Sequence, residues 1–314
     1  MALHLRGMIA NVSSDLSSGA SSESGALVSK IQIFEPHKAS LPAMGPYIRE
    51  FWRRRRFAFE LARFTDKAEH LNSPLGSVWL VLNPLLLALI YFLLVTIIGG
   101  RGSAGSSRFD VLAHILVGLF TWYFAQNCMT FGGASVTAGG KLILNQAFPR
   151  ALLPLSSLIG AFQKFMPTLP VYLIIYLVGG ALDSKSKLPG LNWHLLWVPV
   201  MVALVAISGF GLALLFATMN VYFRDTSKLM TYGARMWLYL SPVLWMPEMI
   251  HGWHRILIWA NPLGPILAIT NTVWIKGENP SWTLWLGATG WAFGLLFIGG
   301  YFFVSRERDF AVRI

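Results

Sequence analysis

Basic side chains are the chemically most distinctive residues of this sequence. Four of them are consecutive, namely Arg53, Arg54, Arg55 and Arg56. Paired guanidinium groups match the geometry of a phosphate, so this cluster could bind a lipid diphosphate at a membrane surface. Alternatively, the cluster only holds a helix on anionic lipid, with about 1 kcal/mol for each charge near the surface. We prefer the second interpretation.

The sequence offers no constellation for catalysis. Its long apolar segments lack Asp and Glu, whereas an intramembrane enzyme needs converging acids, bases or metal ligands. Segment 138–142 comes nearest to a phosphate-binding loop, but Ser135 stands where the motif requires Gly, and Leu142 follows the Lys in place of Ser or Thr. His251 and His254 could share a helix face, yet a third metal ligand is not evident. We therefore expect no enzyme, no metal and no ATP site in this chain.

The composition is that of a membrane protein. Of 314 residues, 55% are apolar and only 12% are charged, whereas soluble domains carry about 25% charged residues. The net charge is +11, but the mean hydropathy of +0.56 argues against a basic hydrated surface that binds nucleic acid. The single cysteine, Cys128, excludes an intrachain disulfide. We expect an all-α, multi-pass membrane protein.

Several apolar segments could cross a membrane, which takes roughly 20 residues of helix. They are 70–100, 111–140, 165–182, 188–223, 226–247, 256–275 and 279–305. Segment 256–275 contains Asn261-Pro262 and Gly264-Pro265, which interrupt a helix twice within a few residues. The pattern predicts six transmembrane helices and, at 256–275, a re-entrant outer hairpin before the last span.

Charge distribution predicts the orientation. An even number of spans places both termini on one side, and the positive-inside rule makes that side cytoplasmic, because the basic stretches 49–67 and 306–313 then lie inside. Lys164 is the one basic residue deep in a predicted span. It either faces a watery cavity or extends its charged end toward the membrane surface.

Three regions follow along the chain. Residues 1–45 form a Ser-rich tail that we expect to be disordered, because it offers little apolar surface. Residues 46–72 combine an apolar row with a cationic face, which predicts an amphipathic helix in the cytoplasmic interface. Residues 73–314 form the transmembrane domain.

Three passages of the sequence follow one another in a specific order and spacing. They are 73–85 (Ser-Pro-Leu-Gly-Ser-Val-Trp-Leu-Val-Leu-Asn-Pro-Leu), then Asn145-Gln146-Ala147-Phe148-Pro149-Arg150 with Pro154-Leu155, and last 220–225 with Ser241-Pro242-Val243 and Asn261-Pro262-Leu263. Together they resemble the membrane subunits of bacterial ABC exporters of lipid-linked polysaccharide, over about residues 46–314. Two features depart from that family. The basic residue expected after the hairpin Asn-Pro is replaced by Thr270-Asn271, and the acidic residue near the C-terminus is missing from 310–312.

The resemblance implies a homodimer with two copies of a separate ATPase subunit, which binds the ATP and Mg. It also implies a polyprenyl-linked substrate of galactan, O-antigen or teichoic acid type, and the bacterial inner membrane as the location. Two loops would contact the ATPase through Lys141, Asn145, Phe148, Pro149 and Arg150 in the first, and Phe223, Arg224, Asp225 and Lys228 in the second. Alternatively, the basic residues of these loops only keep them on the cytoplasmic side.

Aromatic side chains are candidates for the pore. Ring faces pack on sugars, while Tyr and Trp add polar groups. The candidates are Tyr91, Phe92, Trp122, Tyr123, Phe124, Trp237, Tyr239 and Trp245. Many of the 13 Trp residues could instead belong to interfacial belts. The alternatives for the whole chain are a permease of the same architecture for a drug or lipid, a polytopic carrier-linked glycosyltransferase, and a passive channel.

Overall fold

The computed structural model describes residues 43–70, 78–98, 107–182, 186 and 188–314, and within these ranges it contains helices and no strand. All of them belong to one compact unit, Leu41–Ile314. The predicted tail falls almost wholly outside the described residues. The helices are α2 (Met44–Arg53), α3 (Arg55–His70), α4 (Val78–Ile98), α5 (Arg108–Ala138), α6 (Gly140–Asn145), α7 (Leu152–Phe165), α8 (Thr168–Leu182), α9 (Val198–Tyr222), α10 (Thr226–Leu240), α11 (Ile256–Ala260), α12 (Gly264–Asn271), α13 (Trp282–Arg306) and α14 (Phe310–Arg313), joined by the single turns η1 (Trp193–Trp197), η2 (Pro247–Met249), η3 (Gly252–Arg255), η4 (Thr272–Lys276) and η5 (Glu307–Asp309).

Four helical stretches among the described residues are long and apolar enough to cross a membrane. They are Phe109–Ala138, Leu152–Leu182, Trp193–Tyr222 and Trp282–Arg313. The pair Gly252–Ala260 and Gly264–Lys276 passes the same test together but bends by 107°, at the segment where the hairpin is predicted. Helix α4 has 21 residues and α10 has 15, so α10 is shorter than the roughly 17 residues of the shortest usual span. The count of six spans therefore stays a prediction.

Helix α5 is the centre of the bundle and packs against α4, α7, α8, α9, α10 and α12. Its start is defined by a capping box, in which the Ser107 hydroxyl accepts a hydrogen bond from the Phe109 N–H (3.0 Å) and the Asp110 carboxylate accepts one from the Ser107 N–H (3.4 Å). Helix α9 lies between α5 and α13. There α9 and α13 approach so closely that a Cβ on Gly299 would lie 2.1 Å from the carbonyl oxygen of Gly211, as in the small-residue contacts of membrane helices.

The predicted interface helix 46–72 is two helices, α2 and α3, which meet at Arg54. There the backbone N–H of Arg54 still bonds to the Glu50 carbonyl at 3.0 Å, but φ −92° and ψ 10° end the first helix. Helix α3 packs against α7 through small residues, since Ala58 and Ala62 are buried. Trp52 and Phe64, by contrast, are exposed, which is the arrangement that an interfacial helix needs.

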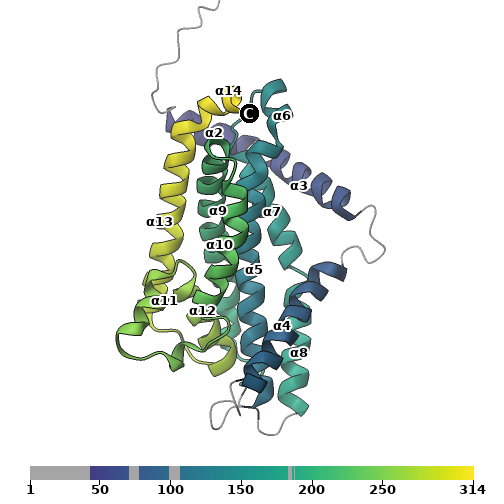
Figure 1. Cartoon of the computed structure of the whole chain (residues 1–314), viewed down its shortest axis with the longest axis vertical. Helices are drawn as coiled ribbons and strands as arrows, with labels where there is room; N and C mark the ends of the chain where they lie inside the picture. Colours follow the sequence, from purple (N-terminus) through teal and green to yellow (C-terminus); the bar gives the residue numbers. More distant parts are fainter. Residues whose placement is uncertain (1–42, 71–77, 99–106, 183–185, 187) are drawn as a thin grey trace, which may run out of the picture. The chain divides into compact units, whose positions relative to one another are not determined.

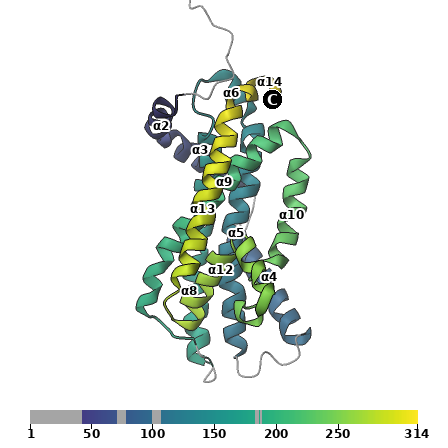
Figure 2. The ribbon, with the colours of Figure 1, turned by 90° about the vertical axis from the view of Figure 1, so that its left-hand side faces the viewer.

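The two views agree on which segments share an end of the bundle. Helices α6 and α14 lie at the end of the bundle where α2 meets α3, and α11 and α12 lie toward the opposite end (Figure 1, Figure 2). We call these the α6 end and the α12 end.

Candidate functional site

Both loops predicted to contact an ATPase lie at the α6 end. Helix α6 exposes Lys141, Leu144 and Asn145, and the Asn145 side chain donates to the Lys141 carbonyl at 2.8 Å. The turn between α9 and α10 exposes Phe223, Arg224 and Asp225. Lys228 follows on α10 and forms an exposed ion pair with Asp225 at 3.6 Å. The sequence analysis did not single out Leu144, although it is 63% exposed; it follows Leu142 and Ile143, so the sequence offered no signal for its exposure.

The second half of the first loop packs against the rest of the chain. Pro149 is buried and Phe148 is half-buried. The Arg150 backbone N–H donates to the Glu307 carboxylate, and the Arg150 guanidinium donates to the Glu307 carbonyl. Burial lowers the pKa of Arg150, and the nearby Glu307 opposes that shift. The predicted residues of this loop therefore divide into an exposed group on α6 and a group that ties the loop to the C-terminal end of α13.

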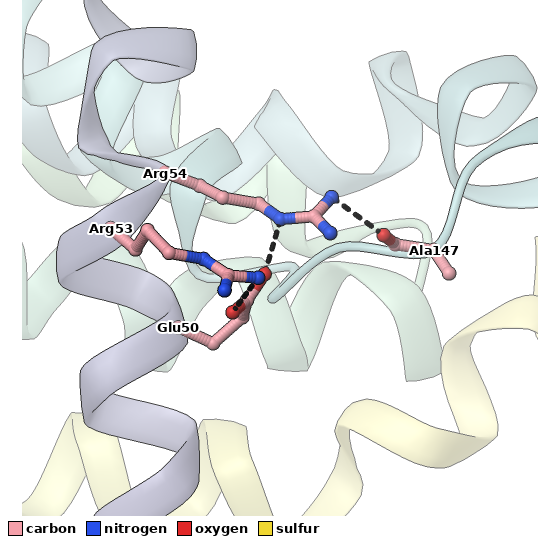
Figure 3. A network of polar contacts seen from close by, with 4 residues as sticks. All are labelled: Glu50, Arg53, Arg54 and Ala147. Carbon is pink, nitrogen blue, oxygen red and sulfur yellow. Dashed lines mark hydrogen bonds and ion pairs between the residues drawn. The ribbon is translucent and has the colours of Figure 1, made fainter.

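The arginine cluster also divides. Arg53 Nη2 lies 2.6 Å from a carboxylate oxygen of Glu50, and the Arg54 Nε binds the other oxygen of the same carboxylate. Arg54 also donates from Nη1 to the Ala147 carbonyl at 2.9 Å (Figure 3). The Arg55 guanidinium stacks 4.7 Å from the Trp52 ring centre. Arg53, Arg54 and Arg55 thus differ in their sets of partners, which a run of identical residues could not reveal.

The predicted pore residues fall into three places. Tyr91 on α4 meets Tyr239 on α10 edge to face, with ring centres 6.4 Å and hydroxyl oxygens 3.5 Å apart. Trp122 on α5 contacts its neighbour Tyr123, with ring centres 5.4 Å apart, and Trp237 on α10, with ring centres 6.5 Å apart.

Phe124 lies apart from them and stacks on Phe165 of α7 at 4.9 Å. Trp122 and Phe124 are each 2% exposed, whereas Tyr239 is 58% exposed. Phe92 packs half-buried on the core, and Trp245 donates from Nε1 to the Tyr239 carbonyl at 3.3 Å. In this conformation Trp122 and Phe124 are covered by the chain itself, whereas the other six candidates are at least partly exposed.

Lys164 lies beside two cavities. Its Nζ is 4.4 Å from the centre of the Phe131 ring. Both residues line a cavity of about 310 Å³ between α3, α5 and α7, and a second of about 310 Å³ between α4, α5 and α7. Which of the two environments that the sequence leaves open applies to Lys164 stays a prediction.

The buried side chain of Asn271 connects several elements at the α12 end, and the sequence analysis missed its role. The Asn271 side-chain oxygen accepts a hydrogen bond from His114 Nδ1 at 2.9 Å, and its amide nitrogen donates to Glu248 at 3.0 Å. Glu248 also pairs with Lys276 at 2.7 Å. Asn271 stands where the resemblance predicted a basic residue, so the departure from the family pattern was the signal.

In the described part of the chain, no group of three or more His, Cys, Asp or Glu side chains is placed so that it could hold a metal ion. His254 stacks on its neighbour Trp253 with ring centres 4.0 Å apart. His251 and His254 are both exposed at the α12 end.

Comparison with known proteins identifies the family. A profile described as "ABC-2 type transporter" (ABC2_membrane) matches residues 69–270. The chain belongs to this family. Two relatives are the O-antigen export system permease protein RfbA of Klebsiella pneumoniae, 28% identical over 212 residues (67% of this chain and 77% of the relative), and that of Myxococcus xanthus, 24% identical over 269 residues (85% and 98%). The resemblance to polysaccharide-export permeases is thereby confirmed, and this ABC-2 chain is a multi-pass membrane subunit of a transporter.

Proposed function

We propose that this chain is the permease of an ATP-driven exporter that moves a lipid-linked polysaccharide, of O-antigen, galactan or teichoic acid type, across the bacterial inner membrane. The observation that carries the proposal is the match along most of the chain to permeases named for O-antigen export. The described residues agree with it, since they present exposed loops and exposed aromatic side chains.

The proposed orientation places the α6 end in the cytoplasm. Both termini are then inside, and α2 and α3 lie in the cytoplasmic interface with their exposed aromatic side chains in lipid. Helices α4, α5, α7 with α8, α9, α10 and α13 form six spans, and the bent pair α11 and α12 is re-entrant from the outer side. Positive-inside bias supports this orientation, because Lys141, Arg224 and Lys228 all lie at the α6 end.

The proposed partner is a separate ATPase subunit, two copies of which bind a homodimer of this chain and supply the ATP and Mg site. Helix α6 and the turn at Phe223 offer it an exposed surface that combines apolar and basic groups, namely Leu144, Phe223, Lys141 and Arg224. Aromatic and arginine side chains are typical anchors of protein interfaces. A short helix continued into two long ones can transmit a rigid-body motion of the partner to the membrane domain.

The proposed glycan path follows α4 and α10. Tyr91 and Tyr239 expose ring surface and hydroxyl groups on facing helices, and both kinds of surface suit a sugar that must pass without tight binding. Helix α10 also carries Trp237, whose indole is half-buried beside the path.

The test begins with complex formation. The chain is co-expressed with the ATPase encoded nearest to it, purified through a tag on the chain, and assayed for ATP hydrolysis in nanodiscs. We expect Phe223→Asp and Lys141→Glu to lower ATPase recovery at least tenfold. Matched controls at the α12 end are Trp253→Asp and Arg255→Glu, which likewise replace an exposed aromatic residue by Asp and an exposed basic residue by Glu and should leave recovery unchanged. Failure of any ATPase to associate, or equal losses in the controls, would contradict the proposal.

The substrate class is tested separately. Cells depleted of the permease should accumulate lipid-linked glycan on the cytoplasmic side, and Tyr91→Ala with Tyr239→Ala should reproduce part of that accumulation while ATP hydrolysis continues. Stimulation of ATP hydrolysis by small amphiphiles, with no accumulated glycan, would instead indicate a permease for a drug or lipid.

A further inference from the structure

The junction of α2 and α3 is attached to the loop that directly follows α6. Arg54 donates from Nη1 to the Ala147 carbonyl at 2.9 Å, over 93 residues of sequence (Figure 3). Phe57, at the start of α3, contacts Phe148 with ring centres 5.3 Å apart. Loop 146–151 therefore contacts the α2–α3 arm through one charged hydrogen bond and one aromatic pair.

A third contact holds the same loop from the other flank. The Arg150 backbone N–H and guanidinium both bond to Glu307, which is 8% exposed. Tyr47 of α2 is half-buried beside this pair, and burial together with the negative charge of Glu307 raises the pKa of its hydroxyl. The loop thus lies between the arm and the end of α13, so a change in the arm reaches it directly.

Glu50 determines where the Arg54 side chain lies. Its carboxylate binds Arg53 and Arg54 at once, as the sticks in Figure 3 show. Two guanidinium groups around one anion are also the arrangement in which arginines bind a phosphate. The Arg53 side chain is 72% exposed, so an anion arriving from the membrane surface can reach it.

We propose that Glu50 occupies the place of a lipid phosphate group, and that Arg54 is a positioning residue which makes loop 146–151 respond when the phosphate displaces Glu50. The idea rests on the proposed function and adds a form of regulation to it. A phosphate bound to Arg53 and Arg54 releases the Glu50 carboxylate and draws the Arg54 guanidinium away from Ala147. Loop 146–151, which leads from the ATPase-contacting α6 into α7, then loosens, and ATP hydrolysis rises. The ligand class is a phosphate head group with net negative charge on a membrane lipid.

The first test measures hydrogen exchange of the amides of residues 146–151 in the permease alone. Nanodiscs of phosphatidylcholine are compared with nanodiscs that contain phosphatidylglycerol or a polyprenyl diphosphate at equal mole fraction. In the natural sequence we expect either anionic lipid to speed exchange by roughly three- to tenfold, the effect of losing one charged hydrogen bond at a partly exposed site. A response to phosphatidylglycerol assigns the site to bulk lipid, whereas a response to the diphosphate only assigns it to a carrier.

Three variants are compared in the same exchange experiment. Arg54→Ala should show the faster exchange already in phosphatidylcholine and no further response to anionic lipid. Glu50→Gln should exchange faster than the natural sequence already in phosphatidylcholine, because the carboxylate that binds Arg54 is lost. It should still respond to anionic lipid, and at a lower mole fraction, because the competing charge is removed. Arg49→Ala removes a charge from the same helix at an exposed residue and should behave like the natural sequence.

Two results would overturn the proposal. One is exchange in Arg54→Ala that matches Arg49→Ala in every lipid; the other is no response of the natural sequence to either anionic lipid. ATP hydrolysis by the complex is then measured in the same lipids, where stimulation should be lost in Arg54→Ala and kept in Arg49→Ala. Because exchange is recorded without the ATPase, a failure of the complex to assemble would count against the proposed function and leave this inference to be decided by the exchange data.

Discussion

Trp237 on α10 donates its indole N–H to the side-chain oxygen of Asn261, with 2.9 Å between nitrogen and oxygen. Asn261 stands between α11 and α12, so this bond joins the bent pair to the helix that carries Tyr239. The Asn261 amide also donates to the Ser241 hydroxyl at 2.8 Å, and its oxygen accepts from the Leu263 N–H at 3.0 Å. One buried side chain thus connects the proposed outer hairpin to the proposed glycan path.

Replacing Asn261 should therefore be costly. Asn261→Ala leaves the Trp237 and Leu263 donors without this acceptor in a buried site, and each such group costs about 1–3 kcal/mol. We expect a clear fall in the midpoint of thermal unfolding in detergent. The control is Asn279→Ala, which removes a longer bond, 3.4 Å, to Trp197 at an exposed position and should have little effect. Equal shifts in the two variants would show that the Asn261 bonds do not stabilise the hairpin.

Removing the second buried asparagine, Asn271, should lower the free energy of unfolding more than breaking the ion pair next to it. Asn271→Ala deprives His114, which is 3% exposed, of its partner at Nδ1, and we expect about 1–3 kcal/mol of destabilisation. Lys276→Ala breaks an ion pair whose side chains are 38% and 42% exposed, and such pairs contribute about 0–1 kcal/mol. Urea unfolding followed by tryptophan fluorescence compares the two. A larger loss for Lys276→Ala would reverse this ranking.

The long helices were predictable because they lack fixed charge over more than a membrane's thickness. Segments 111–140 and 279–305 correspond to α5 and α13 with small differences at their ends, and segment 188–223 contains α9, which begins only at Val198. The break at Arg54 was not predictable, since arginine is a good helix former. Its side chain binds a carboxylate one turn earlier and a carbonyl 93 residues along the chain, and the second contact exists only in the folded protein.

Which aromatic residues face a path was equally beyond the sequence. Helix α5 is apolar all round and lacks the periodicity that distinguishes one face from another. Trp122 and Phe124 are buried because α10 and α7 cover them, whereas Tyr123 between them stays partly open. Only the neighbours decide this, and a pattern along one helix carries no information about its neighbours.

Acid should act on the α2–α3 arm through Glu50. Hydrogen bonds and charge from Arg53 and Arg54 lower the pKa of this carboxyl from its ordinary value of 4.5. A lowered pKa means that the interaction is fully present above about pH 4.5 and is lost as the pH falls through the lower value of the folded protein. We expect exchange of residues 146–151, corrected for intrinsic rates, to accelerate in that acidic range. Glu50→Gln should remove this dependence, and its persistence in that variant would assign the effect to another group.

Adding a methyl group at the contact of α9 with α13 should destabilise the protein, and the neighbouring residue provides the control. In Gly299→Ala the added methyl group would lie 2.1 Å from the Gly211 carbonyl oxygen, which belongs to a helix backbone and cannot rotate aside. The two helices must separate, and overpacking of this kind costs about 1–3 kcal/mol. Gly300→Ala adds the same methyl group where nothing lies within 4 Å, so it should be neutral or should stabilise the helix by up to about 1 kcal/mol. Unfolding midpoints of both variants in one detergent decide the matter: a Gly299→Ala protein as stable as Gly300→Ala would mean that α9 and α13 do not approach this closely in the membrane domain.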